Sequence, residues 1–244
     1  MRPEDVEPRL RALGYGERDA RTLADHFIAA EARGKTGHGF SRVEWLETLE
    51  HDPSARPRRE VHEAEFERWD GNGALGYLTL AAIVETTLIA RPQYARLIVA
   101  RRTFPTGMLG YWVRKLAEGG LVALLTATSP RRLAHPDGGA KLTGTNPVAV
   151  GIPSSDGRPI VADVSMGKVT YGDVLAGDAD ERDLVPFGGE HAHKAFALAA
   201  GLQLVVDSLA GADHGAVLLV ARPTHDPVPA FRALAAGARL PGDA

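Results

Sequence analysis

The sequence contains no cysteine, so disulfide bridges and thiolate metal sites are excluded. It also lacks an excess of positive charge: 28 lysines and arginines against 31 aspartates and glutamates give a formal net charge of −3, which argues against nucleic acid as a partner. No apolar run approaches the roughly 18 residues that span a bilayer, and "MRPEDVEPRL" does not have the pattern of a signal peptide. We therefore expect a soluble, cytoplasmic protein with no membrane partner.

What the sequence does contain is an ordinary globular composition, with 44% apolar and 24% charged residues over 244 positions. This length fits one large domain or two small ones. Helical spacing predicts two N-terminal helices, closed by Gly34, and a third helix capped by Ser41. Beyond them we expect strands at 60–70, 96–101, 121–128, 147–154, 158–165 and 215–223, helices at 78–90, 107–120 and 189–211, and a frayed tail at 234–244.

Three glycine-rich segments have the composition of anion-binding sites. "DGNGALG" (70–76) contains G-x-G-x-x-G between a predicted strand and a helix, which fits either a dinucleotide fingerprint or a plain turn. The strand before it is too polar for a central parallel strand, although Arg101 and Arg102 leave an NADP site open. "HPDGGAKLTGTNP" (135–147) fits either an anion cradle or a long hairpin loop. "PFGGEHAHK" (186–194) leads into a helix N-terminus, with a spacing of His191 and His193 that does not suit zinc.

The segment "ARGKTGHGFSRVEW" (32–45) places His38 between two glycines and four residues before Arg42. A histidine in such a turn is commonly a surface or capping residue. Histidine is also the usual proton carrier near neutral pH, and the arginine fork binds a carboxylate through two hydrogen bonds. One helical turn can bring the two side chains onto one face, so both interpretations stay open on local grounds.

Together, these segments resemble the malate/L-lactate dehydrogenase family, which lacks a Rossmann fold and includes ureidoglycolate and sulfolactate dehydrogenases and Δ1-piperideine-2-carboxylate reductases. The resemblance is carried, in the family's order, by "ADHFIAAEARGKTGHGFSR", "DGNGALG", "DGGAKLTGTNPVAVGIP", "ADVSMGKVTYGD" and "PFGGEHAHKAFALAAG". It implies an α/β (α+β) fold with a mainly antiparallel central sheet and a helical N-terminal domain. It thereby displaces the Rossmann interpretation of Gly71, Gly73 and Gly76.

The resemblance also implies a site and an assembly. His38 would be the proton donor or acceptor, and Arg42 would hold the carboxylate of a small substrate. The residues that it places near an NADPH or NADH cofactor are Thr128, Ser129, Gly144, Thr145, Asn146, Asp163, Val164, Ser165, Gly188, Gly189 and Lys194. It implies a homodimer, which the apolar helix faces in 80–90 and 202–211 favour on physical grounds.

We expect three units: a helical substrate and dimerisation domain (1–69) that packs with the C-terminal part, a cofactor-binding domain (70–185), and a C-terminal helix and strand (186–244). The sequence departs from the family's pattern at two positions. Pro105 stands where the family has a second histidine, in an Asn-His-x-Gly turn, and Gly37 replaces the serine before the first histidine. The chain is also shorter than family members.

Two functions follow from this sequence. The first is an NAD(P)H-dependent reductase acting at C2 of a 2-oxo acid or a cyclic imine-2-carboxylate. The second is a divergent member without hydride chemistry, which either catalyses a redox-neutral step or only binds a small carboxylate. The loss of the second histidine motivates the second function, because proline cannot transfer a proton.

Overall fold

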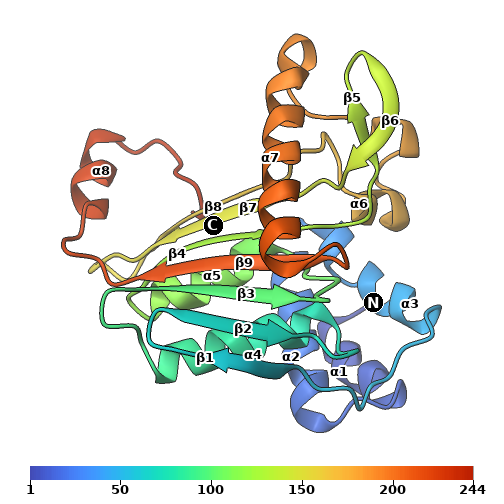
Figure 1. Cartoon of the computed structure of the whole chain (residues 1–244), viewed down its shortest axis with the longest axis horizontal. Coiled ribbons are helices and arrows are strands. Elements are labelled where there is room, and N and C mark those ends of the chain that lie inside the picture. The colour runs from blue at the N-terminus through green and yellow to red at the C-terminus, as the bar shows by residue number, and fades with distance from the viewer. Residues whose placement is uncertain (244) are drawn as a thin grey trace.

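The N-terminal part of the chain is helical in the computed structural model, which describes residues 1–243 (Figure 1). Helices α1 (Pro3–Ala12) and α2 (Glu17–Glu31) pack together and are followed by the 3-10 turn η1 (Thr36–His38) and helix α3 (Ser41–Glu47). Leu23 and Phe27 lie one turn apart on α2 and are buried, as helical spacing predicts. The N-cap of α3 is Phe40, not the predicted Ser41, whose hydroxyl donates to the Thr36 carbonyl (2.7 Å).

A seven-stranded sheet lies beside these helices, in the order β1-β2-β3-β9-β4-β7-β8. Its strands are β1 (Arg58–His62), β2 (Phe66–Asp70), β3 (Ala95–Arg101), β4 (Val122–Ala127), β7 (Val148–Ile152), β8 (Ile160–Val164) and β9 (Gly215–Ala221). β2 and β3 pair in parallel, and the other neighbouring strands pair antiparallel. The helical N-terminal part and the mainly antiparallel sheet confirm the predicted fold class.

The segment 60–70, predicted as one strand, is a hairpin of β1 and β2. The Glu63 N–H donates to the Phe66 carbonyl (2.9 Å) and closes its turn. β2 is polar although it lies inside the sheet, because its two buried carboxylates, Glu67 and Asp70, are paired with arginines. Glu67 accepts hydrogen bonds from Arg96 Nη1 (3.0 Å) and Trp69 Nε1 (2.8 Å). Burial of a charge is tolerated only with such partners.

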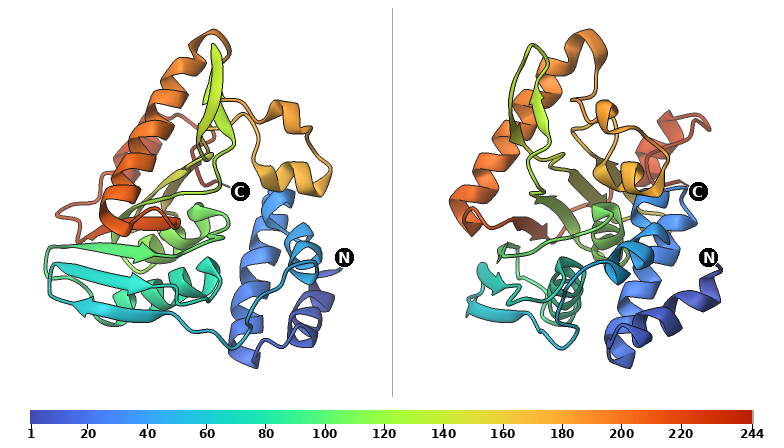
Figure 2. Two further views of the ribbon diagram at one scale, coloured as in Figure 1. Left: turned by 45° about the vertical axis from the view of Figure 1, so that its right-hand side comes forward. Right: turned by 90° about the vertical axis from the view of Figure 1, so that its right-hand side faces the viewer.

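Helices cover the two faces of the sheet unequally (Figures 1 and 2). On one face, α5 (Leu109–Glu118) packs on β4 and β7, and α4 (Gly76–Ile89) packs on α5 and α2. The apolar run of α4 is buried there, so the prediction that this helix presents a free apolar face was wrong. On the other face, α7 (Ala192–Ala210) packs on β9 and β4 and rises beyond the sheet. It exposes Leu198, Leu204, Val205 and Leu209.

The segment 135–147 contains most of a short hairpin, and its role as an anion cradle stays a prediction. β5 (Leu133–His135) and β6 (Gly138–Thr143) form a separate two-stranded sheet beside α7. Helix α6 (Tyr171–Ala176) and the 3-10 turns η2 (Glu181–Asp183) and η3 (Gly189–His191) then connect β8 to α7. A capping box fixes the start of α6: Asp173 N–H donates to the Thr170 hydroxyl (3.3 Å), and Thr170 N–H donates to the Asp173 carboxylate (2.8 Å).

The sheet takes strands from all three predicted units, because β9 lies between β3 and β4. α7 packs mainly on β9, β4 and β3 rather than on the N-terminal helices, so the predicted bounds do not separate the sheet into domains. After α8 (Val228–Leu234), the tail predicted to be frayed folds back. Arg114 Nη2 donates to the Gly242 carbonyl (2.8 Å), and Val161 N–H donates to the Pro241 carbonyl (3.1 Å). Among residues 1–243, no helix is both long and apolar enough to cross a membrane.

Candidate functional site

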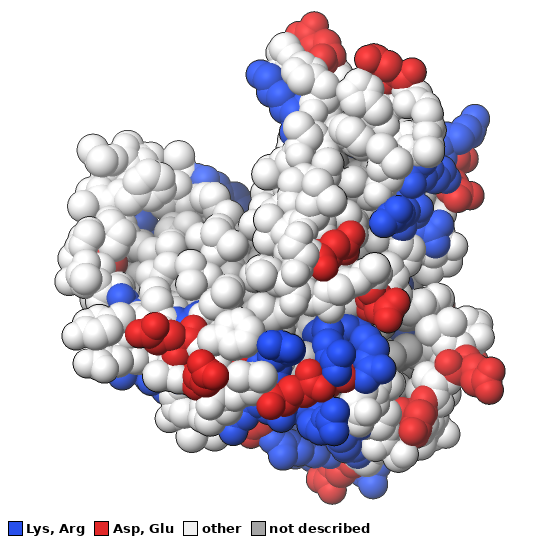
Figure 3. Space-filling model, in the orientation of Figure 1, with Lys and Arg blue, Asp and Glu red and all other residues white. Residues whose placement is uncertain are grey.

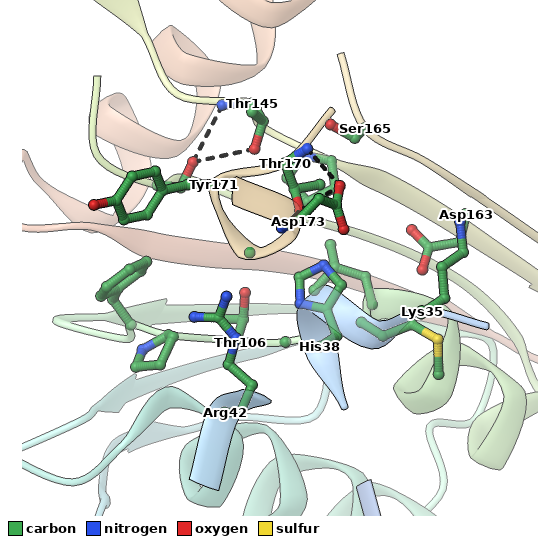
Figure 4. A pocket seen from close by; sticks show the side chains of 18 of the residues that line it. Lys35, His38, Arg42, Thr106, Thr145, Asp163, Ser165, Thr170, Tyr171 and Asp173 are labelled. Carbon is green, nitrogen blue, oxygen red and sulfur yellow. Dashed lines mark hydrogen bonds between the residues drawn. The ribbon is translucent and has the colours of Figure 1, made fainter. Parts of the chain in front are cut away.

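A cavity of about 610 Å³ lies where η1 and α3, the turn after β3, and α6 meet (Figure 4). We call it the inner cavity. His38 and Arg42 both line it, so the structure brings together the two residues that the sequence singled out. Figure 4 shows them entering from one side, with Asp173 and Thr170 of the α6 segment opposite and with Lys35 and Asp163 at one end.

The turn that carries His38 is held by its two glycine neighbours. A Cβ on Gly37 would collide with the side chain of Asp173, and one on Gly39 would collide with the carboxylate of Glu31. That carboxylate accepts a hydrogen bond from the Phe40 N–H (2.9 Å) and fixes the start of α3. The close approach of α6 therefore explains why Gly37 stands where the family's pattern has a serine.

Arg42 is 7% exposed and is anchored at the base of its guanidinium. Its Nε donates to the Gly37 carbonyl (2.6 Å), and its guanidinium carbon lies 5.1 Å from the ring centroid of Trp45. Among residues 1–243, no acceptor is hydrogen-bonded to its two terminal nitrogens. A positioned guanidinium with two free donors suits a carboxylate that binds through both oxygens.

His38 is half-buried, and burial lowers its pKa to about 4, with a further lowering by the charge of Arg42. The carboxylate of Asp173 acts in the opposite direction. The imidazole is therefore neutral at pH 7. Within the described chain, no hydrogen bond occupies either ring nitrogen of His38, so both are available to a ligand.

Asp163 lies at the other end of the cavity, and burial raises the pKa of its carboxyl group. One oxygen accepts a hydrogen bond from the Gly110 N–H at the start of α5 (2.7 Å). Asp163 was predicted from sequence as a cofactor residue, and its position against the cavity keeps it available for that role.

The remaining wall is largely apolar and comes from the turn after β3. Phe104, Pro105 and Met108 line it, so Pro105 presents a ring where the family's pattern has a second histidine. A fully buried histidine, His26, supports this turn from behind: its Nε2 accepts a hydrogen bond from the Met108 N–H (3.1 Å). Burial lowers the pKa of His26 to about 3, so it stays neutral.

The residues predicted to contact a cofactor divide into groups by position. Thr128, Ser129, Thr145 and Ser165 line the inner cavity, as Asp163 does. The Thr145 N–H donates to the Ser129 hydroxyl (3.2 Å), which ties these two hydroxyl-bearing segments together (Figure 4). This group lies against the same cavity as His38 and Arg42.

Six predicted cofactor residues lie outside this lining, and three of them are Asn146, Gly144 and Val164. Asn146 is fully buried, and its Nδ2 donates to the Ala199 carbonyl (3.0 Å) and to Gln203 Oε1 (2.9 Å) of α7. Gly144 passes so close to Ser129 that a Cβ would collide with it. Val164 points to solvent at the end of β8. Asn146 and Gly144 therefore hold the Ser129 and Thr145 segments in place.

Gly188 and Gly189 line a second cavity of about 1010 Å³, which we call the outer cavity. It is bounded by the β5–β6 hairpin and the segment from η2 to α7. Lys194 is exposed and lines neither cavity. Whether these three residues bind a cofactor stays a prediction.

The G-x-G-x-x-G segment lines neither cavity. Gly71 N–H donates to the Arg101 carbonyl (2.9 Å) and Gly76 N–H to the Phe104 carbonyl (3.3 Å), so the glycines pack this turn against the turn after β3. Arg102 forms two hydrogen bonds with Asp70, one of 2.9 Å from its Nε, and Arg101 pairs with Glu60 (2.6 Å). The structure therefore supports the plain-turn alternative and gives the arginines acidic partners instead of a phosphate.

Sequence reasoning missed several residues that line the inner cavity, namely Lys35, Trp45, Tyr77, Thr106, Arg132, Tyr171 and Asp173. Asp173 carried a usable signal, because Thr170-x-x-Asp173 has the spacing of a capping box. The others come from segments that no local motif connects to His38.

Comparisons with known proteins agree with this fold. The sequence model described as malate/L-lactate dehydrogenase matches residues 4–184. Among curated proteins, a malate dehydrogenase of Pyrococcus horikoshii is 27% identical over 240 residues, which cover 83% of this chain and 64% of that protein. A Δ1-pyrroline-2-carboxylate/Δ1-piperideine-2-carboxylate reductase of Pseudomonas syringae pv. tomato is 30% identical, with coverage of 79% and 64%.

A dehydrogenase from Sinorhizobium meliloti has a similar solved structure, with a TM-score of 0.84 at 24% identity. The match covers 100% of this chain and 89% of that one. This likeness shows the common fold. The chain spans just under two thirds of the two curated relatives that it matches.

Proposed function

The chain belongs to the malate/L-lactate dehydrogenase family, and on that premise we propose that it is an NAD(P)H-dependent reductase. Its substrate is a small carboxylic acid with a C=O or C=N group at C2, either a 2-oxo acid or a cyclic imine-2-carboxylate. The observation that carries the proposal is the joint position of His38 and Arg42 on one cavity wall, facing Thr145 and Ser165.

Arg42 binds the substrate's carboxylate. Its Nε donates to the Gly37 carbonyl and its guanidinium lies over the Trp45 ring, so the terminal nitrogens are oriented before the ligand arrives. A carboxylate held there places C2, the neighbouring atom, inside the cavity that His38 also lines.

His38 exchanges the proton with the oxygen or nitrogen on C2. The positive charge of Arg42 contributes to its low pKa, and a bound carboxylate neutralises that charge. Substrate binding therefore favours the protonated imidazole, which is the form that donates a proton in the reductive direction.

The described residues fit a nicotinamide nucleotide. The hydroxyls of Thr128, Ser129, Thr145 and Ser165 gather on the wall that also carries Asp163, and such neutral donors and acceptors suit an amide and a ribose. When bound, the nucleotide supplies a hydride for C2. The chain's own residues supply orientation, a proton and an enclosed, partly apolar wall.

Pro105 favours the imine among the two substrate classes. Its ring, with Phe104 and Met108, offers apolar contact and no proton donor beside the reacting atom. An imine nitrogen can be protonated before hydride transfer, so it depends less on a second acid than a carbonyl oxygen does. The apolar wall also suits the methylene groups of a cyclic imine.

The first test is tryptophan fluorescence during titration with NADH and NADPH, because Trp45 lines the cavity. We expect quenching or energy transfer at micromolar cofactor; silence at millimolar concentration would refute the reductase. The second test is His38→Ala, which should lower the turnover of a cyclic imine-2-carboxylate by roughly 10²–10⁴-fold. His225→Ala, an exposed histidine outside both cavities, is the control and should leave turnover unchanged.

A second candidate function is a redox-neutral reaction or simple binding of a small carboxylate. The position of Pro105 in the cavity wall favours it, because the family's second histidine is absent. This candidate predicts carboxylate binding that depends on Arg42 together with no response to either nicotinamide cofactor. The same fluorescence titration therefore separates the two candidates.

We further propose that the protein is a homodimer. Leu97, Leu219, Leu124 and Val150 form one row across β3, β9, β4 and β7, and Leu124 and Leu219 are 42% and 45% exposed. Helix α7 packs on β9 and β4 and exposes Leu198, Leu204 and Leu209. Figure 3 shows a hollow between α7 and α8 whose surface is mostly uncharged. An apolar surface of this kind is stabilised when a second copy covers it.

A further inference from the structure

Arg132 lines both the inner and the outer cavity, and it is the charged residue that their linings share. It precedes β5, and its backbone N–H donates to the Thr143 carbonyl (2.8 Å), which fixes it to the β5–β6 hairpin. Its guanidinium carbon lies 3.4 Å from the ring centroid of Tyr171 on α6. The guanidinium therefore lies where the two cavities meet.

The guanidinium is held in place by stacking rather than by hydrogen bonds. Its side chain is 26% exposed, and its nearest carboxylate, Glu181, is 4.0 Å away and 61% exposed. In residues 1–243, no hydrogen bond is made by any of its five N–H groups. Stacking on an aromatic ring orients an arginine and leaves its in-plane donors free for an anion.

The two cavities also divide the residues expected at the cofactor. Thr128, Ser129 and Thr145 line the inner one, and Gly188 and Gly189 line the outer one. A nicotinamide dinucleotide has two nucleoside ends joined by a doubly charged pyrophosphate. An elongated ligand that used both groups of residues would pass Arg132 at its middle.

We propose that Arg132 binds the pyrophosphate of the dinucleotide, with the nicotinamide end in the inner cavity and the adenosine end in the outer cavity. This inference rests on the proposed reductase function. Lys141 adds positive charge to the outer cavity, whereas Lys168 and Arg182, which also line it, pair with Asp183 (2.6 Å) and Asp180 (2.9 Å). The pyrophosphate therefore meets one oriented guanidinium rather than a diffuse basic surface.

Calorimetric titration of ADP-ribose and NADPH into the wild type, Arg132→Leu and Arg132→Lys tests the proposal. ADP-ribose carries the pyrophosphate and adenosine without the nicotinamide. Arg132→Leu should lower the affinity for both ligands by at least about tenfold, which is the effect of losing a charge-assisted hydrogen bond. Arg132→Lys should fall between the wild type and Arg132→Leu, because it keeps the charge but loses the fork and the stacking.

Arg131→Leu is the matched control, since Arg131 is the adjacent arginine, exposed and outside both cavities, and should change neither affinity by more than about twofold. If Arg132→Leu binds NADPH and ADP-ribose as tightly as the wild type does, the proposal is overturned and the reductase function is left intact. Weaker binding of a small dicarboxylate such as oxaloacetate with unchanged ADP-ribose binding would also overturn it and assign Arg132 to the substrate. A wild type that binds neither nucleotide would overturn both proposals. If Arg132→Leu fails to fold, Arg132→Lys provides the comparison.

Discussion

Arg42→Lys is the sharpest test of how the inner cavity recognises a substrate. Lysine keeps the positive charge but has a single nitrogen in place of the planar fork. It cannot at once donate to the Gly37 carbonyl and present two parallel N–H groups to a ligand. A role of charge alone would survive the substitution, and a two-point clamp would not.

The magnitude follows from the contacts that Arg42 makes. Losing a charge-assisted hydrogen bond to the ligand costs about 1.5–3 kcal/mol, which corresponds to roughly tenfold to hundredfold weaker carboxylate binding. Loss of the bond to the buried Gly37 carbonyl lowers the free energy of unfolding by about 1–3 kcal/mol in addition. NADPH affinity should change by less than about twofold, because Arg42 stands on the substrate side of the cavity.

Arg96→Lys is a matched control for the loss of stability. Arg96 is 5% exposed and donates to the Ala64 carbonyl (3.1 Å) and to buried Glu67, but it lines neither cavity. Both variants should unfold at a lower urea concentration than the wild type. Only Arg42→Lys should bind pyrrole-2-carboxylate, a planar analogue of the cyclic imine, more weakly in calorimetry. The clamp would be refuted if Arg42→Lys lost equal affinity for the carboxylate and for NADPH, or if it lost no affinity for the carboxylate.

Three further outcomes are expected. Stability should fall on acidification below pH 6.5, because the unfolded chain binds protons at His26 and His38 while burial holds their folded pKa values near 3 and 4. The free energy of unfolding should drop by up to about 1.4 kcal/mol per pH unit for each histidine. Urea unfolding between pH 7 and 4.5 measures this drop, and an unchanged pH dependence in His26→Gln would contradict it. Asn146→Ala should lower the free energy of unfolding by about 2–4 kcal/mol, because two acceptors on α7 lose their donor; a loss under about 1 kcal/mol in urea would show that these bonds contribute little. Light scattering should show a dimer at micromolar concentration, and a particle near 26.0 kDa would rule the dimer out.

Much of the fold was predictable because its signals are local. The apolar periodicity of α2 and the apolar runs of β4 and β9 identify these elements without tertiary information. The split at 60–70 was not predictable, because its turn, Glu63 to Glu65, contains neither glycine nor proline. The burial of Glu67 depends on Arg96, which lies in another strand and is invisible to a local pattern.

The site was predictable only where residues follow one another closely. His38 ends η1 and Arg42 lies in the first turn of α3, so the short turn at Gly39 and Phe40 brings the two side chains to one cavity. Arg132 and Tyr171 meet because the β5–β6 hairpin and α6 fold onto each other, and no spacing in the sequence signals that contact. Asn146 shows a third case: the motif that contains it was noticed, but its side chain turns inward to α7 instead of toward the cavity.

The central position of β9 has a consequence for synthesis on the ribosome. β3 and β4 are completed about a hundred residues before β9, yet each needs β9 as its neighbour along nearly its whole length. Until then, the nascent chain carries two unpaired apolar strand edges, which are the surfaces that associate with other chains. The central part of the sheet can therefore assemble only after β9 has been synthesised. A chain stalled before residue 215 should depend on chaperones far more than one released after 221.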